Sequence, residues 1–287
     1  MKSICIKTNN SKCINYLLNE LKNTSIDKVL FRFCKFKHYE NVVIHYKGED
    51  NSSFISQVSS ILSFLVIDEL EEIFYKRIIS HEYFYFDKFE RKSIFDICFD
   101  IISEDNNEFF NKKYLSLHHS FFEYLSENKS IVLEGFINFR IPEYFSILEE
   151  IVDEAVNSFV VEKEYLEFIS LLKLYINSQR ATCEFVHLVY FKDHSIILDK
   201  DKNIISASSD LLNAKYLSDI SFSENDIALN TLLNIVPKKI FIHLINCNPD
   251  EFIKTVSLIF ENKTELCTDC NICKIYMNKK KSELFYK

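Results

Sequence analysis

Glycine and proline are scarce in this sequence, which has 2 Gly, 3 Pro and no Trp in 287 residues. Glycine-rich loops bind phosphate because their backbone comes close to the ligand, so the scarcity of glycine argues against a nucleotide-binding loop of this kind. All-β folds with many tight turns need the same two residue types. The composition therefore favours helices, and the hydrophobic content of 47% is sufficient to bury cores.

An excess of positive charge is also absent, because the formal net charge is -8. A chain of this charge has no general attraction for a nucleic-acid backbone, so we do not expect nucleic acid as a main partner. The longest uncharged run, residues 51–67, contains six serines and is too polar and slightly too short to span a bilayer. No hydrophobic stretch typical of a signal peptide follows Met1. We therefore predict a cytoplasmic protein without a membrane span.

The hydrophobic pattern predicts an α+β fold, with a predominantly helical middle domain between two small α/β modules. Apolar residues alternate at the beginning of the chain and again after Cys183, which indicates strands in both places. In the middle of the chain the apolar residues recur every three or four positions, which indicates helices. We therefore predict three domains, namely an α/β module at residues 1–80, a helical domain at residues 81–182 and a second α/β module at residues 183–287.

The last module contains a strand–helix–strand pattern. The segment KKIFIHLI (238–245) predicts the first strand, residues 248–262 predict the helix, and KTEL (263–266) predicts the second strand. Such a unit places its two strands parallel, with their carboxyl ends at the same edge of the sheet. Cys247 follows the first strand and Cys267 follows the second, so we expect these two regions to be neighbours.

Three cysteines near the end of the sequence, Cys267, Cys270 and Cys273, form a C-x2-C-x2-C motif. The chain has nine cysteines, an odd number that favours reduced thiols or metal ligands over a set of disulfides in a cytoplasmic protein. Tetrahedral zinc needs four nitrogen or sulfur ligands. We therefore predict a metal site formed by Cys247, Cys267, Cys270 and Cys273, with His243 as a substitute ligand and zinc as the first choice of metal.

The same motif leaves three alternatives open. The spacing C-x2-C-x2-C begins the cysteine run of bacterial ferredoxins, but this chain has no further cysteine after three more residues, so an iron–sulfur cluster ranks below zinc. Closely spaced CxxC pairs also exchange disulfides, which would make the site a thiol-redox centre. The third alternative is an exposed tail whose cysteines bind no metal.

Three segments, LEGFINFRIPEYF, EEIVDEAVNSFVVEKEYLEFISLLKLYI and CTDCNIC, together resemble the YtxC-like sporulation proteins of spore-forming bacteria. The resemblance is strongest between Leu133 and Ile176, and the order of the elements fits across most of the chain. It implies a cytoplasmic bacterial protein that is linked with sporulation. It implies no particular reaction, because the biochemical activity of the family is not established.

The sequence contains no complete catalytic signature, which favours a protein without enzymatic activity. We predict a non-catalytic interaction or scaffold protein with a protein partner, in which a metal stabilises the end of the last module. The long middle helices are the predicted binding face, because 27 Phe and 15 Tyr are many for the cores to bury. The alternative is an iron–sulfur or thiol-redox protein that uses the same cysteines.

Overall fold

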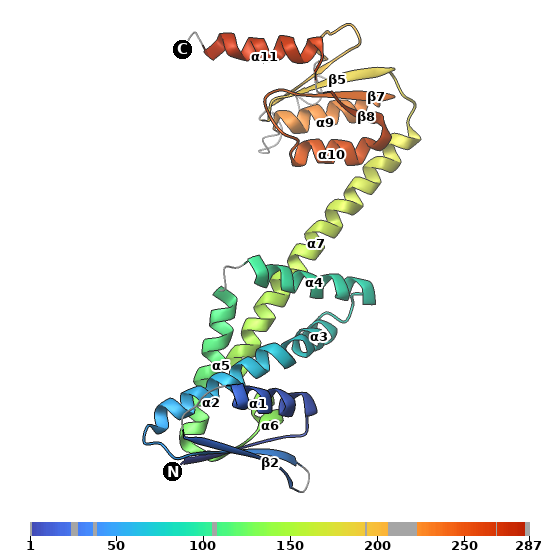
Figure 1. Cartoon of the computed structure of the whole chain (residues 1–287). Coiled ribbons are helices and arrows are strands. Elements are labelled where there is room, and N and C mark those ends of the chain that lie inside the picture. Colours follow the sequence, from blue (N-terminus) through green and yellow to red (C-terminus); the bar gives the residue numbers. More distant parts are fainter. Residues whose placement is uncertain are drawn as a thin grey trace. The chain divides into compact units, whose positions relative to one another are not determined.

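The computed structural model of the chain describes residues 2–23, 28–36, 39–104, 108–192, 194–205, 223–267 and 269–284. The chain forms two compact units, residues 1–162 and residues 163–287. Each unit contains a small four-stranded sheet, and helices occupy the middle of the chain (Figure 1). The predicted α+β fold class is therefore confirmed.

Unit 1 contains a mixed sheet in the strand order β2-β3-β1-β4. Strand β1 (Lys2–Thr8) pairs antiparallel with β3 (Tyr39–Tyr46), which pairs antiparallel with β2 (Val29–Phe36). Strand β4 (Ser130–Val132) pairs parallel with the other side of β1. The sequence predicted the first three strands but not β4, because three residues are too few to show an alternating pattern.

The helices of unit 1 share one hydrophobic core with the sheet, and this core extends from Ile4 to Val156. The predicted boundary near residue 80 lies within this stretch, and the division of the chain into three domains stays a prediction. In chain order the helical elements are α1 (Ser11–Asn23), α2 (Asn51–Leu65), the π-helical turn η1 (Val66–Leu70), α3 (Glu71–Glu82), α4 (Lys88–Glu104), α5 (Glu108–Glu127), α6 (Leu133–Arg140) and the first part of α7 (Pro142–Ser178).

The continuous helix Asn51–Glu82, which comprises α2, η1 and α3, is long and apolar enough to cross a membrane by length and composition. However, 56% of its apolar window is buried inside the protein. Helices in the core of a folded domain meet the same two criteria, because they are apolar on most sides. Phe54, Leu62 and Leu65 are at most 1% exposed, so this helix packs into the hydrophobic core of unit 1.

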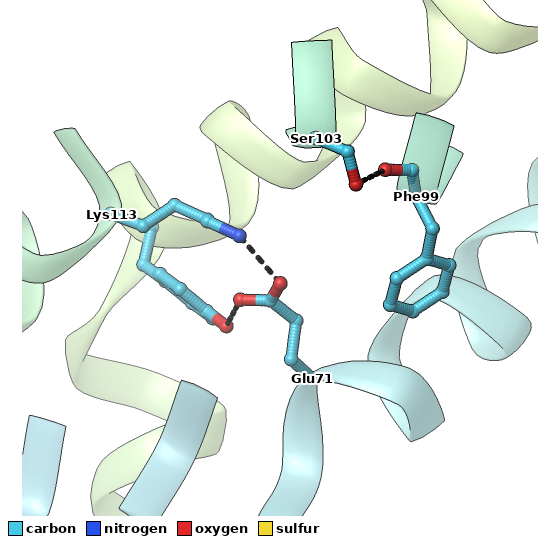
Figure 2. Close-up of polar contacts among 5 residues, drawn as sticks. Glu71, Phe99, Ser103 and Lys113 are labelled. Atoms are coloured by element: carbon cyan, nitrogen blue, oxygen red, sulfur yellow. Dashed lines mark hydrogen bonds and ion pairs between the residues drawn. The ribbon is translucent and has the colours of Figure 1, made fainter. Parts of the chain in front are cut away.

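A buried ion pair lies in the core of unit 1. The Lys113 ammonium on α5 donates to Oε1 of Glu71 on α3 at 2.5 Å (Figure 2). The Tyr144 hydroxyl on α7 donates to the other oxygen, Oε2, at 2.8 Å. The side chains of Lys113 and Glu71 are only 1% and 8% exposed, and a buried charge is costly without a partner. Burial and the Glu71 carboxylate raise the pKa of Tyr144, which therefore remains a neutral donor. The network joins three helices of the core.

We expect Lys113→Met to destabilise the protein by about 3–5 kcal/mol, because it leaves the Glu71 carboxylate buried without a cation. Urea unfolding followed by circular dichroism measures the change. The matched control is Lys112→Met, since the Lys112 side chain is 50% exposed and pairs with Glu108 at the surface. This control should change the stability by less than about 1 kcal/mol. Equal effects of the two substitutions would contradict the structural role of the buried pair.

Unit 2 is built on a mixed sheet in the strand order β6-β5-β7-β8. Strand β5 (Phe185–Tyr190) pairs antiparallel with β6 (Ser195–Leu198) and parallel with β7 (Lys239–Leu244). Strand β7 pairs parallel with β8 (Thr264–Cys267), and α10 (Glu251–Phe260) connects the two through the short turn η2 (Glu261–Lys263). The predicted parallel strand–helix–strand unit is therefore confirmed.

Helices cover both faces of this sheet (Figure 1). On one face α9 (Glu224–Ile235), α10 and the last part of α7 share a core with the strands. On the other face α11 (Asn271–Leu284) packs through Ile272 and Cys273. The sequence did not predict α11, because most of its apolar residues lie in the first two turns and a lysine run follows them.

Candidate metal centre

His243 and Cys267 lie side by side on neighbouring strands. They are partners in the parallel register of β7 and β8, so both side chains point to the same face of the sheet. Ile242, the residue before His243, belongs to the core under α9 and α10. Because successive residues of a strand point to opposite faces, His243 points toward α11. Alternation along the strands thus directs an imidazole and a thiol to the face that α11 covers.

Cys270 and Cys273 come from the start of α11. Cys270 precedes the helix, and its carbonyl oxygen accepts a hydrogen bond from the N–H of Lys274 at 3.0 Å. The Sγ atoms of Cys270 and Cys273 are 3.8 Å apart, and they lie 3.5 Å and 3.4 Å from Nδ1 of His243. The ligand atoms of His243, Cys267, Cys270 and Cys273 all lie within 4.8 Å of one another. The three cysteines of the motif therefore lie around His243, and their role as metal ligands stays a prediction.

These separations fit a single tetrahedral ion. Zinc binds thiolate sulfur at about 2.3 Å and imidazole nitrogen at about 2.0–2.1 Å. Tetrahedral angles then place two sulfurs about 3.8 Å apart, and a sulfur and a nitrogen about 3.5 Å apart. The distances among Cys270, Cys273 and His243 agree with both values.

The site is closed toward the sheet and more open at its outer side. His243 and Cys273 are 2% and 1% exposed, whereas Cys267 and Cys270 are half-buried. Burial lowers the pKa of His243 to about 4, and the nearby His187 adds to this shift. The imidazole of His243 is therefore neutral at pH 7, which is the state that binds a metal.

The three thiols do not ionise equally. Burial acts to raise the pKa of Cys270, but the backbone N–H groups of Cys273 and Ile272 and the neighbouring thiols hold its thiolate and lower the pKa. Burial and the adjacent Cys270 raise the pKa of Cys267 to about 12, and burial raises the pKa of Cys273. One thiolate therefore opposes the ionisation of its neighbours. A bound cation would remove this opposition and allow all three thiols to ionise.

His187 is a further residue of the site that the sequence did not reveal. Its Nδ1 lies 2.9 Å from Nε2 of His243. When Nε2 of His243 donates its proton to this acceptor, Nδ1 of His243 carries the lone pair that faces the sulfurs. The strand pattern of residues 185–190 includes His187, but only the parallel pairing of β5 with β7 brings it to His243. This pairing of distant strands left no signal in the local sequence pattern.

Cys247 lies apart from this group. Its thiol donates to the carbonyl oxygen of Tyr190 at 3.6 Å, and its side chain packs against the core under α9 and α10. The structure thus brings together His243 and the three cysteines of the motif, and does not bring Cys247 to them. In this geometry the substitute ligand, His243, stands where a fourth cysteine was expected.

The sequence model of the YtxC-like family matches residues 56–265 of this chain. The chain belongs to the YtxC-like family. One relative is the "Uncharacterized protein YtxC" of Bacillus subtilis (strain 168), which is 21% identical over 196 residues, covering 66% of this chain and 68% of the relative. No solved structure matches the chain. The predicted family is therefore confirmed.

The family match covers parts of both units but ends before the cysteine motif. Residues 56–265 include His187 and His243 and stop short of Cys267, Cys270 and Cys273. Three of the four candidate ligands therefore lie outside the region that the family model matches.

We expect His187→Leu to lower the affinity for Zn²⁺ by about 10–100-fold, because His243 loses the acceptor that fixes its tautomer and its orientation. A competition titration against a chromogenic zinc chelator measures the affinity. The matched variant is His187→Asn, whose amide oxygen can still accept from Nε2 of His243, and it should retain most of the affinity. If His187→Leu binds zinc as the wild type does, His187 does not position His243.

Proposed function

We propose that His243, Cys267, Cys270 and Cys273 bind one Zn²⁺ ion in a structural site. The observation that carries the proposal is the convergence of three sulfurs and one imidazole nitrogen within 4.8 Å. These four ligands would complete a tetrahedron and leave no position for water or substrate. Closed sites of this kind are structural, whereas catalytic zinc sites keep one position open.

A metal at this position would join three separate parts of unit 2. His243 would hold β7, Cys267 would hold the end of β8, and Cys270 and Cys273 would hold the start of α11. The helix α11 has 14 residues, and a helix of this length is marginal by itself in water. Metal binding would therefore supply part of the folding free energy of the last module.

An iron–sulfur cluster is the alternative metal centre. In a four-iron cluster each thiolate binds a different iron, so the ligand sulfurs stand farther apart than they do around one ion. The separation of 3.8 Å between the sulfurs of Cys270 and Cys273 supports a single ion.

Thiol redox chemistry is the second candidate function, and the lowered pKa of Cys270 favours it. A disulfide substrate would accept two electrons and two protons and leave as two thiols. The sulfurs of Cys270 and Cys273 would then be joined in a disulfide. The same reaction would remove two of the four zinc ligands. Zinc binding and disulfide formation at these cysteines would therefore exclude each other.

We expect the full-length protein, purified without oxygen, to contain about one zinc per chain and to show no visible absorption, because zinc has a filled d shell. Elemental analysis and an absorption spectrum test this expectation. Visible bands with bound iron would support the iron–sulfur alternative. Absence of both metals, with a reversible disulfide between Cys270 and Cys273, would support the redox alternative.

Cys270→Ser should remove the bound zinc and the stabilisation that it supplies. That stabilisation is about 3–4 kcal/mol when free zinc is about 100–1,000 times its dissociation constant. Thermal unfolding with and without a chelator measures the loss. The matched control is Cys247→Ser, a half-buried thiol of the same unit outside the group, which should keep both the zinc and its effect on melting. The ligand set is wrong if Cys270→Ser keeps the zinc or Cys247→Ser loses it.

We further propose that the protein acts by binding a protein partner in sporulating cells, as the resemblance to sporulation proteins implies. Large apolar side chains on α7 support this role, because Phe168, Leu171 and Leu174 are 55%, 64% and 68% exposed. They are spaced three residues apart and therefore lie near one another on the helix surface. Exposed apolar surface of this kind is typical of protein interfaces.

The double substitution Leu171→Ser and Leu174→Ser should abolish the capture of this partner, because it removes the central apolar contacts of an interface. Crosslinking in sporulating cells, followed by mass spectrometry, measures the capture. The matched control is Leu115→Ser on α5, where the side chain is 63% exposed. The partner should be recovered with the control as with the wild type. Identical crosslinked products from the wild type, the double variant and the control would show that α7 is not the binding face.

A further inference from the structure

A groove between α3 and α4 in unit 1 gathers positive charge. The groove has a volume of about 540 Å³, and no carboxylate lines it in the part of the chain that the structure describes. This concentration of cations is local, because the chain as a whole has a net charge of -8. The groove is lined by four cations and by apolar side chains, among them Lys76, Lys88, Arg91, Lys92, Ile79 and Phe95.

Arg91 fixes the shape of the turn that joins α3 to α4. Its Nε donates to the carbonyl oxygen of Phe86 and its Nη2 donates to the carbonyl oxygen of Phe84, each at 2.8 Å. Phe86 is 9% exposed and packs edge-on against Phe159, which anchors the turn in the core. Phe84 and Tyr85 are held outside, at 71% and 64% exposure. The turn therefore presents aromatic rings to solvent in a fixed backbone conformation.

Phe89 on the first turn of α4 extends this aromatic surface and is 82% exposed. The two carboxylates beside it cap the helix. Asp87 Oδ1 accepts from the N–H groups of Phe89 and Glu90 at 2.7 Å and 2.9 Å, and Glu90 Oε2 accepts from the N–H of Asp87 at 2.8 Å. Lys92 lies three residues after Phe89 and is its neighbour on the helix surface.

Lys88 and Lys92 are exposed, and neither forms an ion pair with any residue in the described ranges. Lys76, by contrast, pairs with Glu72. Aromatic rings are enriched where a membrane meets water, and lysine and arginine are attracted to anionic lipid headgroups. A soluble anion would use only the cations and would leave the fixed aromatic rings unexplained. A surface that is anionic outside and apolar beneath complements both features.

We propose that this corner of unit 1 binds the surface of an anionic phospholipid membrane. Lipid phosphate groups occupy the groove beside Lys88, Arg91 and Lys92, and Phe84, Tyr85 and Phe89 enter the interfacial layer. The protein lies on the membrane and does not cross it, since the contacts come from one turn and one helix end. This site is in unit 1 and is independent of the metal centre in unit 2.

Sedimentation of the full-length protein with lipid vesicles tests the proposal. Vesicles of equal parts phosphatidylglycerol and phosphatidylcholine should bind the protein, and vesicles of pure phosphatidylcholine should bind it at least about tenfold more weakly. The double substitution Lys88→Gln and Lys92→Gln should weaken binding about 25-fold, because each cation near an anionic surface contributes about a factor of five. Phe89→Ser should weaken it by about fivefold to tenfold, through the loss of buried apolar area.

Two matched controls should bind the vesicles as the wild type does. Phe139→Ser on α6 removes an aromatic residue that is also 82% exposed, and Lys112→Gln on α5 removes an exposed lysine. Thermal unfolding verifies that each variant is folded. Equal binding to both kinds of vesicle, or wild-type binding by the Lys88 and Phe89 variants, overturns the proposal. Calorimetric binding of inorganic phosphate without any vesicle binding would assign the groove to a soluble anion and would also overturn it.

Discussion

The parallel pairing of β7 with β8 is the constraint on which the metal centre depends. It makes His243 and Cys267 register partners, so their side chains share one face of the sheet. A shift of the register by one residue would turn one of the two to the opposite face. Burial of Ile240 and Ile242, both 0% exposed under α9 and α10, determines which residues of β7 point away from that core. Hydrophobic burial on one face thus selects the metal ligand on the other.

The electrostatics of the centre follow from its burial. Desolvation keeps the His243 imidazole neutral, and donation from its Nε2 to His187 would leave the lone pair on the ring nitrogen that faces the cysteines. The N–H groups at the start of α11 hold the Cys270 thiolate, while the other two thiols resist ionisation beside it. Three thiols, of which Cys270 has a lowered pKa, and a neutral imidazole provide the donor atoms for a soft or borderline cation. A bound cation would supply the positive charge that stabilises the three thiolates.

Unit 1 contains charged side chains in two different environments, one buried and one exposed. In its core, Lys113 and Glu71 face each other with a tyrosine donor, because an unpaired ion would be costly there. At the corner of α3 and α4, Lys88 and Lys92 remain in water beside exposed aromatic rings. The first arrangement stabilises a fold, whereas the second suits contact with a partner surface. The match to the YtxC-like family includes both arrangements, since residues 56–265 contain all of these side chains.

The sequence by itself determined the elements whose signals are local. Alternating apolar residues located the strands of both sheets except β4, and helical spacing located the long helices. The C-x2-C-x2-C spacing indicated that the three thiols can reach one ion, and the strand–helix–strand order brought Cys267 to the edge of β7. Only the tertiary structure decided between His243 and Cys247, because the pleat of β7 directs His243 toward α11, whereas Cys247 lies beyond the end of the strand and packs against the core under α9 and α10. It also decided the contacts of His187 with His243 and of Lys113 with Glu71, since packing joins these residues across 56 and 42 positions of the chain and no local pattern records such pairs.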